Sequence, residues 1–227
     1  MGSGMPVTGW VSSLCAGDFL GKRQKNGLWN RKPRKLVIGW KQSFQPWKKK
    51  IDEGETVVWA DEVGVSMKPV QGNTWATRGE TPLIFAKTNW KKLSVIGGIT
   101  SGGQFFQQTH EGSIKAAGFI GFLTHLLRHI EGKITVVVDN AKIHRAKVVT
   151  DFVAEQKRLS ITYLPPYSLE LNPIERVWAY VKRHHLANFC PGTLEELKTY
   201  LRRAWPKVRY RQLPARLLGL ELETTST

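Results

Sequence analysis

The stretch "KITVVVDNA", residues 133–141, is a short, continuously apolar run that closes on an acid. Such a run is typical of a strand covered on both faces, inside a sheet that carries helices on each side. Asp139 ends it, and the ligands of α/β sheets gather at the carboxyl ends of strands. Asp139 is therefore either a functional carboxylate or the first residue of an Asx turn, because Asp-Asn also favours turns.

Strand and helix patterns continue on both sides of this run. The β-branched residues 55–65 predict a strand, and "TWATRG" (74–79) and "LSVIGGITSGGQFF" (93–106) predict further strands in hairpins. Helical patterns cover 113–130, 146–157 and 173–185, with a strand over 160–164. A last helix begins at Thr193, with Glu196 completing a capping box, and Pro206 is expected to end it. Strands first, then alternating strands and helices, predict an α/β fold with a mixed β-sheet flanked by helices.

The bulk composition favours a nucleic-acid partner. The chain has 227 residues, with 34 Lys and Arg against 18 Asp and Glu, a net charge of +16. The basic residues concentrate in 1–54 and 176–216, around a nearly neutral centre, as expected of a protein that grips phosphates. No apolar run is long enough for a membrane span, and the start lacks the pattern of a signal peptide. Two distant cysteines indicate thiols in a reducing compartment, so we expect a cytoplasmic protein associated with the nucleoid.

Composition divides the chain into three parts. Residues 1–54 are basic and rich in Gly, Lys and Trp without a helical or strand period, so we expect an irregular extension. Residues 55–220 carry the strand and helix patterns and form the main predicted domain. Residues 221–227 form a tail.

A second acid lies inside the first predicted strand. The period of two puts Asp61 on the face of Val57 and Trp59, and Glu62 on the opposite face. An acid in line with apolar residues is costly unless it is paired or bound to a cation. The alternative is that this face turns to solvent at the strand end, and the neighbouring Glu62 agrees with that.

A third acid opens the helix over 173–185. Asn172 suits the N-cap and Pro173 the first helical position, which leaves Glu175 where capping boxes place a glutamate. Glu175 is therefore either a cap or a functional carboxylate. With Asp61 and Asp139 it completes a trio on two strands and a helix, the kind of ligand set that Mg²⁺ or Mn²⁺ needs.

Three segments carry a resemblance to a known family. "ADE" at 60–62, "VVVDNAKIH" at 136–144 and "LPPYSLELNPIE" at 164–175 resemble, in this order, the catalytic segments of DDE transposases of the bacterial insertion-sequence branch related to mariner elements. Thirty-five residues separate Asp139 from Glu175, which matches that family's usual gap. The similarity covers about residues 55–218 and includes "WATRGETP".

The resemblance implies a ribonuclease H-like fold in which Asp61, Asp139 and Glu175 bind two Mg²⁺ or Mn²⁺ ions. It implies cleavage of double-stranded DNA at element ends by water, followed by attack of the freed 3′-hydroxyl on target DNA. Members generally act as homodimers on paired ends. The active-site neighbours would be Asn140, His144 and Asn172, and the residues expected at DNA are Trp75 and Arg78 in an early hairpin, with Arg176, Lys182 and Arg183 on the helix after Pro173.

The chain also departs from the family pattern. Family members read Pro-Asp where this chain has Leu169 and Glu170, and they begin with helix-turn-helix domains that residues 1–54 do not resemble. Two other functions therefore remain open. One is a truncated, non-catalytic DNA-binding remnant of a transposase, and the other is a different ribonuclease H-like nuclease.

Overall fold

The computed structural model describes residues 47–78, 81–86, 91–165 and 172–210. The extension up to residue 46, the Pro-rich loop over 166–171 and the predicted tail 221–227 lie outside these ranges. Among the helices that the structure describes, none is long and apolar enough to cross a bilayer.

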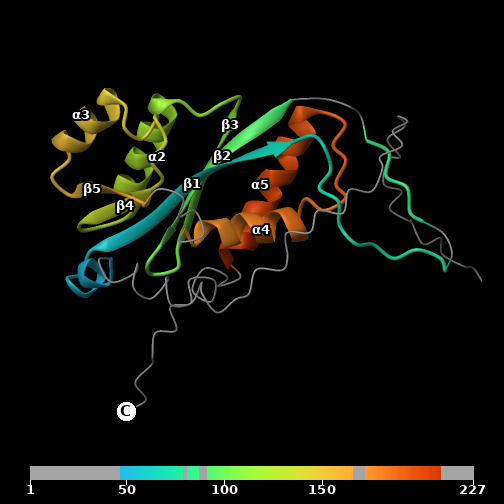
Figure 1. The fold of residues 1–227 in the computed structure, drawn as a ribbon, viewed down its shortest axis with the longest axis horizontal. Helices are drawn as coiled ribbons and strands as arrows, with labels where there is room; N and C mark the ends of the chain where they lie inside the picture. Colours follow the sequence, from blue (N-terminus) through green and yellow to red (C-terminus); the bar gives the residue numbers. More distant parts are fainter. Residues whose placement is uncertain (1–46, 79–80, 87–90, 166–171, 211–227) are drawn as a thin grey trace, which may run out of the picture.

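The centre of the molecule is a mixed sheet of five strands, shown in Figure 1. Their order is β3-β2-β1-β4-β5; β1 pairs antiparallel with β2, as β2 does with β3, whereas β1 with β4 and β4 with β5 are parallel. The bounds are Thr56–Ser66 for β1, Lys92–Thr100 for β2, Phe105–Glu111 for β3, Ile134–Val138 for β4 and Leu159–Tyr163 for β5. The predicted mixed sheet is confirmed, and the 133–141 run forms the fully buried β4.

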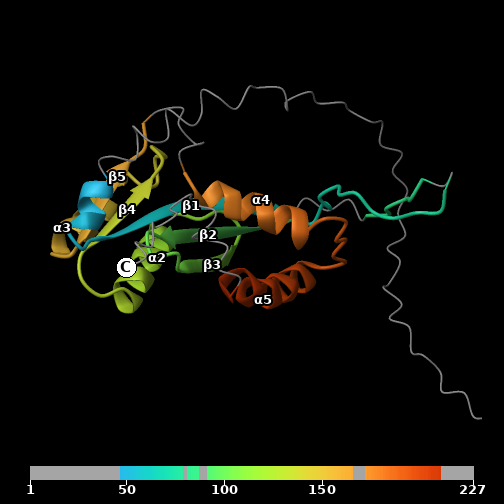
Figure 2. The ribbon, with the colours of Figure 1, turned by 90° about the horizontal axis from the view of Figure 1, so that it is seen from below.

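Helices cover both faces of the sheet, as Figures 1 and 2 show. One face packs against α2 (Ala116–His129) and α3 (Lys147–Glu155), the other against α4 (Ile174–His184) and α5 (Leu194–Tyr210). The period of two along β1 separates the two cores. Trp59 packs with α4 and α5, and Val58 packs with α2. Both are completely buried, so β1 is the shared wall of the two cores.

The segment just before β1 is ordered, although it falls in the predicted irregular extension. Residues 47–52 are helical. Trp47 is buried and meets the ring of Trp59 edge-on, with ring centroids 6.2 Å apart. Glu55 then accepts hydrogen bonds from Lys50 and from the buried Thr135 hydroxyl. These contacts extend the packed unit several residues ahead of the predicted boundary at residue 55.

The hairpin strand predicted over 74–79 is wrong for the residues that the structure describes. Residues 71–77 are neither strand nor helix, and Trp75 is 99% exposed, so this stretch has no apolar face to bury against the sheet. Its start is attached to the loop after α4, because both polar side-chain atoms of Asn188 bond the backbone of Gly72. From there, residues 73–78 and 81–86 project away from the sheet (Figures 1 and 2).

The prediction that Pro206 ends the last helix is also wrong, since α5 runs through it to Tyr210. A proline removes one backbone hydrogen bond, but the buried side chains on either side, Trp205 and Val208, hold the helix on the sheet. The start is as predicted in part. The Thr193 hydroxyl accepts from the Glu196 amide at 3.1 Å, while the Glu196 carboxylate accepts from the Gly192 amide at 2.8 Å.

Candidate active site

Two of the predicted carboxylates lie where the hydrogen-bonded pairing of β1 with β4 ends. β1 has 11 residues and β4 has 5, and their parallel pairing ends with Trp59 opposite Val137. Asp61 and Asp139 each lie two residues beyond this pair, at equivalent positions. Neighbouring strands run about 4.8 Å apart, so both acids come to the same edge. The parallel β1–β4 pairing therefore unites two acids that are far apart in the sequence.

Asp61 is held against the α4 side of the sheet. Its partner on β2 is Gly97, and the ring of Trp178 fills the space that a side chain there would take. The indole Nε1 of Trp178 donates to Oδ2 of Asp61 at 3.2 Å. Burial, and after it the charge of Glu175, raises the pKa of Asp61 to about 7. A cation beside this carboxylate would favour its ionised form.

Asn172 fixes the start of α4 beside β1. Its buried side chain donates from Nδ2 to the carbonyl of Ala60 at 3.1 Å and accepts at Oδ1 from the Ile174 amide at 3.4 Å. Its own carbonyl accepts from the Glu175 amide at 3.2 Å. These bonds tie the residue before Asp61 to the first turn of α4. They explain why the charge of Glu175 is felt at Asp61.

The carboxylate of Glu175 is exposed in the first turn of α4, which begins one residue later than predicted. A capping box would need this carboxylate to accept a backbone amide, and within the described residues it accepts none. Asn172 makes the cap-like bond to the Ile174 amide instead. The predicted cap is thus supplied by Asn172, and the Glu175 carboxylate stays open to a ligand.

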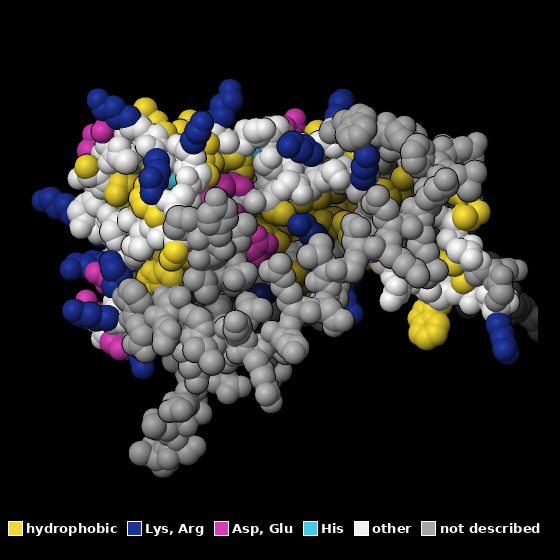
Figure 3. Space-filling view, in the orientation of Figure 1, with side chains coloured by type: hydrophobic (Ala, Val, Ile, Leu, Met, Phe, Trp, Pro, Cys, Tyr) yellow, Lys and Arg dark blue, Asp and Glu magenta, His cyan; other side chains and the backbone are white. Residues whose placement is uncertain are grey.

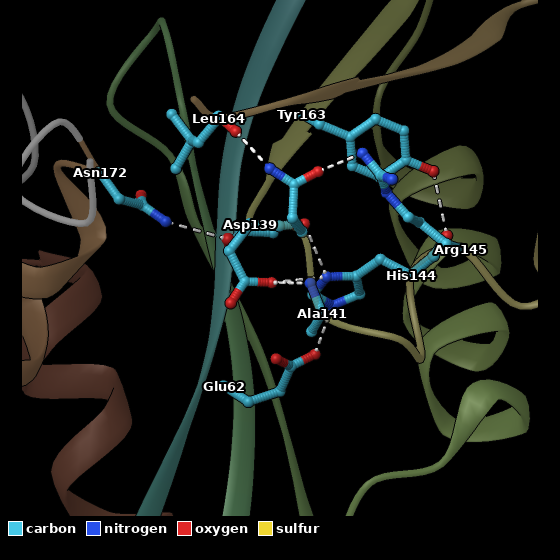
Figure 4. Close-up of polar contacts among 10 residues, drawn as sticks. Glu62, Asp139, Ala141, His144, Arg145, Tyr163, Leu164 and Asn172 are labelled. Atoms are coloured by element: carbon cyan, nitrogen blue, oxygen red, sulfur yellow. Dashed lines mark hydrogen bonds and ion pairs between the residues drawn. The ribbon is translucent and has the colours of Figure 1, made fainter. Parts of the chain in front are cut away.

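Asp139 is bound by the turn that follows β4, as Figure 4 shows. Its Oδ1 accepts from the Ala141 amide at 2.9 Å, which is the predicted Asx turn, and lies 2.9 Å from Nδ1 of His144. The other ring nitrogen, Nε2, lies 3.0 Å from Oε1 of Glu62. His144 is 1% exposed. Asn140, the next residue, turns its amide to the carbonyl of Leu164 at 2.7 Å.

Both ring nitrogens of His144 therefore face acceptor oxygens. Burial opposes a charge on this ring, but the hydrogen bond and the charge of Glu62, with Asp139 adding, raise the pKa of His144 above its usual value. Glu62 was not predicted as a site residue, and this contact with His144 brings it to the site. The available signal was the same as for Asp61, an acid that continues an apolar face of the strand.

The donor atoms suit a divalent cation by type. Oδ1 of Asp139 is used by the Asx turn and His144, whereas Oδ2 has no hydrogen-bond partner in the described part of the chain. Mg²⁺ and Mn²⁺ prefer carboxylate oxygens, and Asp61, whose pKa is raised first by burial and then by the charge of Glu175, is a carboxylate that a cation would stabilise in its ionised form. Among the described residues, no group of three or more Asp, Glu, His or Cys side chains is arranged so that it could hold a metal ion.

One cation beside Asn140 was not foreseen from the sequence. The guanidinium of Arg145 lies over the ring of Tyr163, 4.8 Å from its centroid, and donates to Oδ1 of Asn140. The Tyr163 hydroxyl in turn donates to the carbonyl of His144 at 3.2 Å. Arg145 is exposed but held on two sides (Figure 4). No sequence period marks it, because its partners come from the end of β5 and from the β4 turn.

The residues predicted to contact DNA lie in two places. Arg176, Lys182 and Arg183 are exposed on α4, and Lys182 follows Glu175 by seven residues, so both lie on one face of the helix. Trp75 and Arg78 are exposed on the projecting segment, far along the chain from α4. Figure 3 shows acidic side chains near the middle of one molecular face, with Lys and Arg side chains around them.

The chain matches the family model described as DDE superfamily endonuclease over residues 56–198. It is 26% identical over 156 residues to the insertion element IS630 uncharacterized 39 kDa protein of Shigella sonnei, covering 66% of this chain and 46% of that protein. It is 30% identical over 73 residues to the uncharacterized protein y4pE/y4sA of Sinorhizobium fredii, covering 32% and 51%. The chain spans about half the length of these curated relatives.

Solved structures agree with the family match. The mariner Mos1 paired-end complex with Mg superposes with a TM-score of 0.62 at 20% identity, covering 88% of this chain and 64% of that chain. The catalytic domain of Mos1 mariner transposase gives 0.52 at 17% identity, covering 83% and 92%. The predicted ribonuclease H-like fold is thereby confirmed. With the family model matched over more than half of its length, the chain belongs to the DDE superfamily endonucleases.

Proposed function

We propose that the chain is a transposase catalytic domain that cleaves DNA strands at element ends with divalent metal ions and transfers the 3′-hydroxyl ends into target DNA. The observation that carries this proposal is the position of Asp61 and Asp139 at one open edge of the sheet, with Glu175 close enough to raise the pKa of Asp61. A glutamate that only caps its helix does not need to lie close enough to a half-buried acid on another element to raise the pKa of that acid.

In this proposal Asp61, Asp139 and Glu175 hold two Mg²⁺ or Mn²⁺ ions. The support is the donor chemistry and the fact that solved Mos1 structures contain Mg or Mn. When bound, such ions activate a water and stabilise the charge on the leaving oxygen of a phosphodiester. The residues of this chain position the carboxylates. Trp178 holds Asp61, the Asx turn holds Asp139, and Asn172 holds the helix that carries Glu175.

The substrate in this proposal is double-stranded DNA. Solved Mos1 complexes contain transposon ends, and the strong positive charge of this chain suits a phosphate backbone. Lys182, on the same face of α4 as Glu175, and Arg145, held by Asn140 and Tyr163, would contact phosphates on either side of the cleaved bond. Arg176, Arg183 and the projecting Trp75 and Arg78 would extend this surface. Contacts of this kind predict binding that falls steeply with added salt.

A nicking assay on supercoiled plasmid tests the proposal. The native chain is compared with Glu175→Gln, Asp139→Asn and the control Glu131→Gln, an exposed acid before β4. With Mg²⁺ or Mn²⁺ the native chain and the control nick the plasmid, and with Ca²⁺ they bind without nicking. Both site variants keep salt-sensitive DNA binding and lose the nicks.

Strand transfer is scored separately, as covalent joining of a labelled 3′-hydroxyl oligonucleotide to the plasmid. A chain that binds DNA but never nicks it under any metal would be the non-catalytic remnant. Nicking without joining would identify a different nuclease of this fold. If Asp139→Asn abolished DNA binding along with nicking, the acid would be structural and the metal assignment would fail.

A further inference from the structure

We propose that Glu62 is a positioning residue for the metal site, acting through His144 on the carboxylate of Asp139. The inference rests on the proposed function and adds to it a residue that does not itself touch metal or DNA. Its physical basis is a line of contacts through the sheet. Glu62 Oε1 lies 3.0 Å from His144 Nε2, and His144 Nδ1 lies 2.9 Å from Asp139 Oδ1.

Asp61 and Glu62 serve the same site from opposite faces of β1. Consecutive strand residues point to opposite sides, so Asp61 meets Trp178 on the α4 side, and Glu62 meets His144 on the α2 side. The Glu62 side chain is 21% exposed. The Asp61-Glu62 dipeptide thus serves both carboxylates. It supplies Asp61 itself, and through Glu62 and the His144 ring it holds Asp139.

The ring of His144 has little freedom to turn. It is 1% exposed, and its centroid lies 4.5 Å from that of Phe119. Nδ1 also lies 3.2 Å from the carbonyl of Asp139, so the ring contacts both the backbone and the side chain of this residue. Because Nε2 on the opposite side of the ring is bound to Glu62, the orientation of the ring is fixed, and with it the side-chain orientation of Asp139.

This arrangement decides which oxygen of Asp139 a metal meets. Oδ1 is taken by the His144 ring and by the Ala141 amide, whereas Oδ2 points away from His144 in Figure 4. Without Glu62 the buried Nε2 loses its acceptor, and the ring can rotate to find another. Asp139 then presents its two oxygens in more than one orientation. Outer partners of this kind typically change metal affinity about 10–100-fold when removed.

A merely structural role for Glu62 makes a different prediction, and a matched residue separates the two. Glu55 lies just before the start of β1, is 17% exposed, and also accepts from a buried side chain, the Thr135 hydroxyl at 2.8 Å. Glu55→Ala therefore removes the same type of group and the same type of bond, remote from Asp139. Glu62→Gln keeps an acceptor oxygen for His144 while removing the charge.

The experiment measures Mn²⁺ binding to the full chain by isothermal titration calorimetry, and in parallel the Mn²⁺ concentration that half-saturates plasmid nicking. Glu62→Ala is expected to weaken Mn²⁺ binding about tenfold or more, with nicking recovered at high Mn²⁺. Glu62→Gln is expected to stay within about threefold of the native chain, since the bond to the ring is kept. Glu55→Ala lowers the melting temperature yet leaves Mn²⁺ binding unchanged.

The outcomes separate this inference from the proposed function. If Glu62→Ala and Glu55→Ala bind Mn²⁺ as the native chain does, Glu62 is structural, and the inference falls while the nuclease proposal stands. If the native chain itself neither binds Mn²⁺ nor nicks DNA, the metal assignment falls, and this inference with it. Should Glu62→Ala fold too poorly to study, a loss of Mn²⁺ affinity in Glu62→Gln as large as in Asp139→Asn would also overturn the positioning role, because it would make Glu62 a ligand.

Discussion

The substitution Gly97→Ala tests how Trp178 holds the site. Gly97 is the β2 partner of Asp61 and lies under the Trp178 ring. A Cβ at Gly97 would come 2.5 Å from Cη2 of Trp178 and 3.3 Å from Cδ1 of Ile174. Carbon atoms pack at about 3.5–4.0 Å, so the ring must retreat by roughly 1 Å. Both neighbours are fully buried residues of α4 and cannot move without moving the helix.

The consequences follow from that displacement. Overpacking of this kind costs about 1–3 kcal/mol of unfolding free energy. The bond from Trp178 Nε1 to Asp61 is already 3.2 Å long, and a retreat of about 1 Å breaks it. The first turn of α4, with Glu175, moves as well. A misplacement of about 1 Å can lower a reaction rate roughly 100-fold. The rate of nicking is therefore expected to fall strongly even at temperatures where the variant remains folded.

The neighbouring glycine supplies the control. A Cβ at Gly98 would come 2.8 Å from Cγ1 of Val58 and 3.1 Å from Cζ of Phe122, a similar overlap on the α2 face. Both variants should lose similar stability in urea unfolding, while only Gly97→Ala loses metal-dependent nicking at a temperature where both remain folded. If the two variants nick equally well, Trp178 does not position Asp61, and the reasoning is refuted.

Three further predictions concern the same site. Asn172→Ala removes the bond to the Ala60 carbonyl, so urea unfolding should show a loss of about 1–3 kcal/mol together with weaker nicking; unchanged nicking would contradict the clamp. Because the pKa of Asp61 is raised from 3.8 to about 7, its contribution to the stability of the metal-free chain falls as the pH rises through that window. Mn²⁺ binding at pH 6 should then release close to one proton, which calorimetry in two buffers measures; no release would exclude Asp61 as a ligand. Arg145→Ala should weaken duplex binding in fluorescence anisotropy several-fold and reduce its salt dependence, whereas Arg128→Ala, at an exposed position in the last turn of α2, should not.

Patterns of local periodicity explain which parts of the fold were predictable. The buried run of β4, the apolar stripes of α2 and α4 and the β-branched β1 all identify their elements before any tertiary contact is known. The errors fall where distant contacts overrule local signals. The 74–79 segment has strand-forming residues but no neighbouring strand in the described residues, and Pro206 is retained in α5 by the packing of Trp205 and Val208.

The sequence by itself determined most of the element types, and it marked Asp61 and Asp139 as candidate carboxylates, because an acid that closes or interrupts an apolar strand is visible in one dimension. Only the tertiary structure decided how they meet. The parallel β1–β4 pairing aligns Asp61 with Asp139, and the Asn172 bond to Ala60 holds the first turn of α4, which carries Glu175, beside β1. The contacts of Glu62 and Arg145 also became visible only in the tertiary structure, since their partners are contributed by segments that no periodicity connects. Long-range hydrogen bonds and sheet register set these contacts, and neither is encoded in the spacing of residues along the chain.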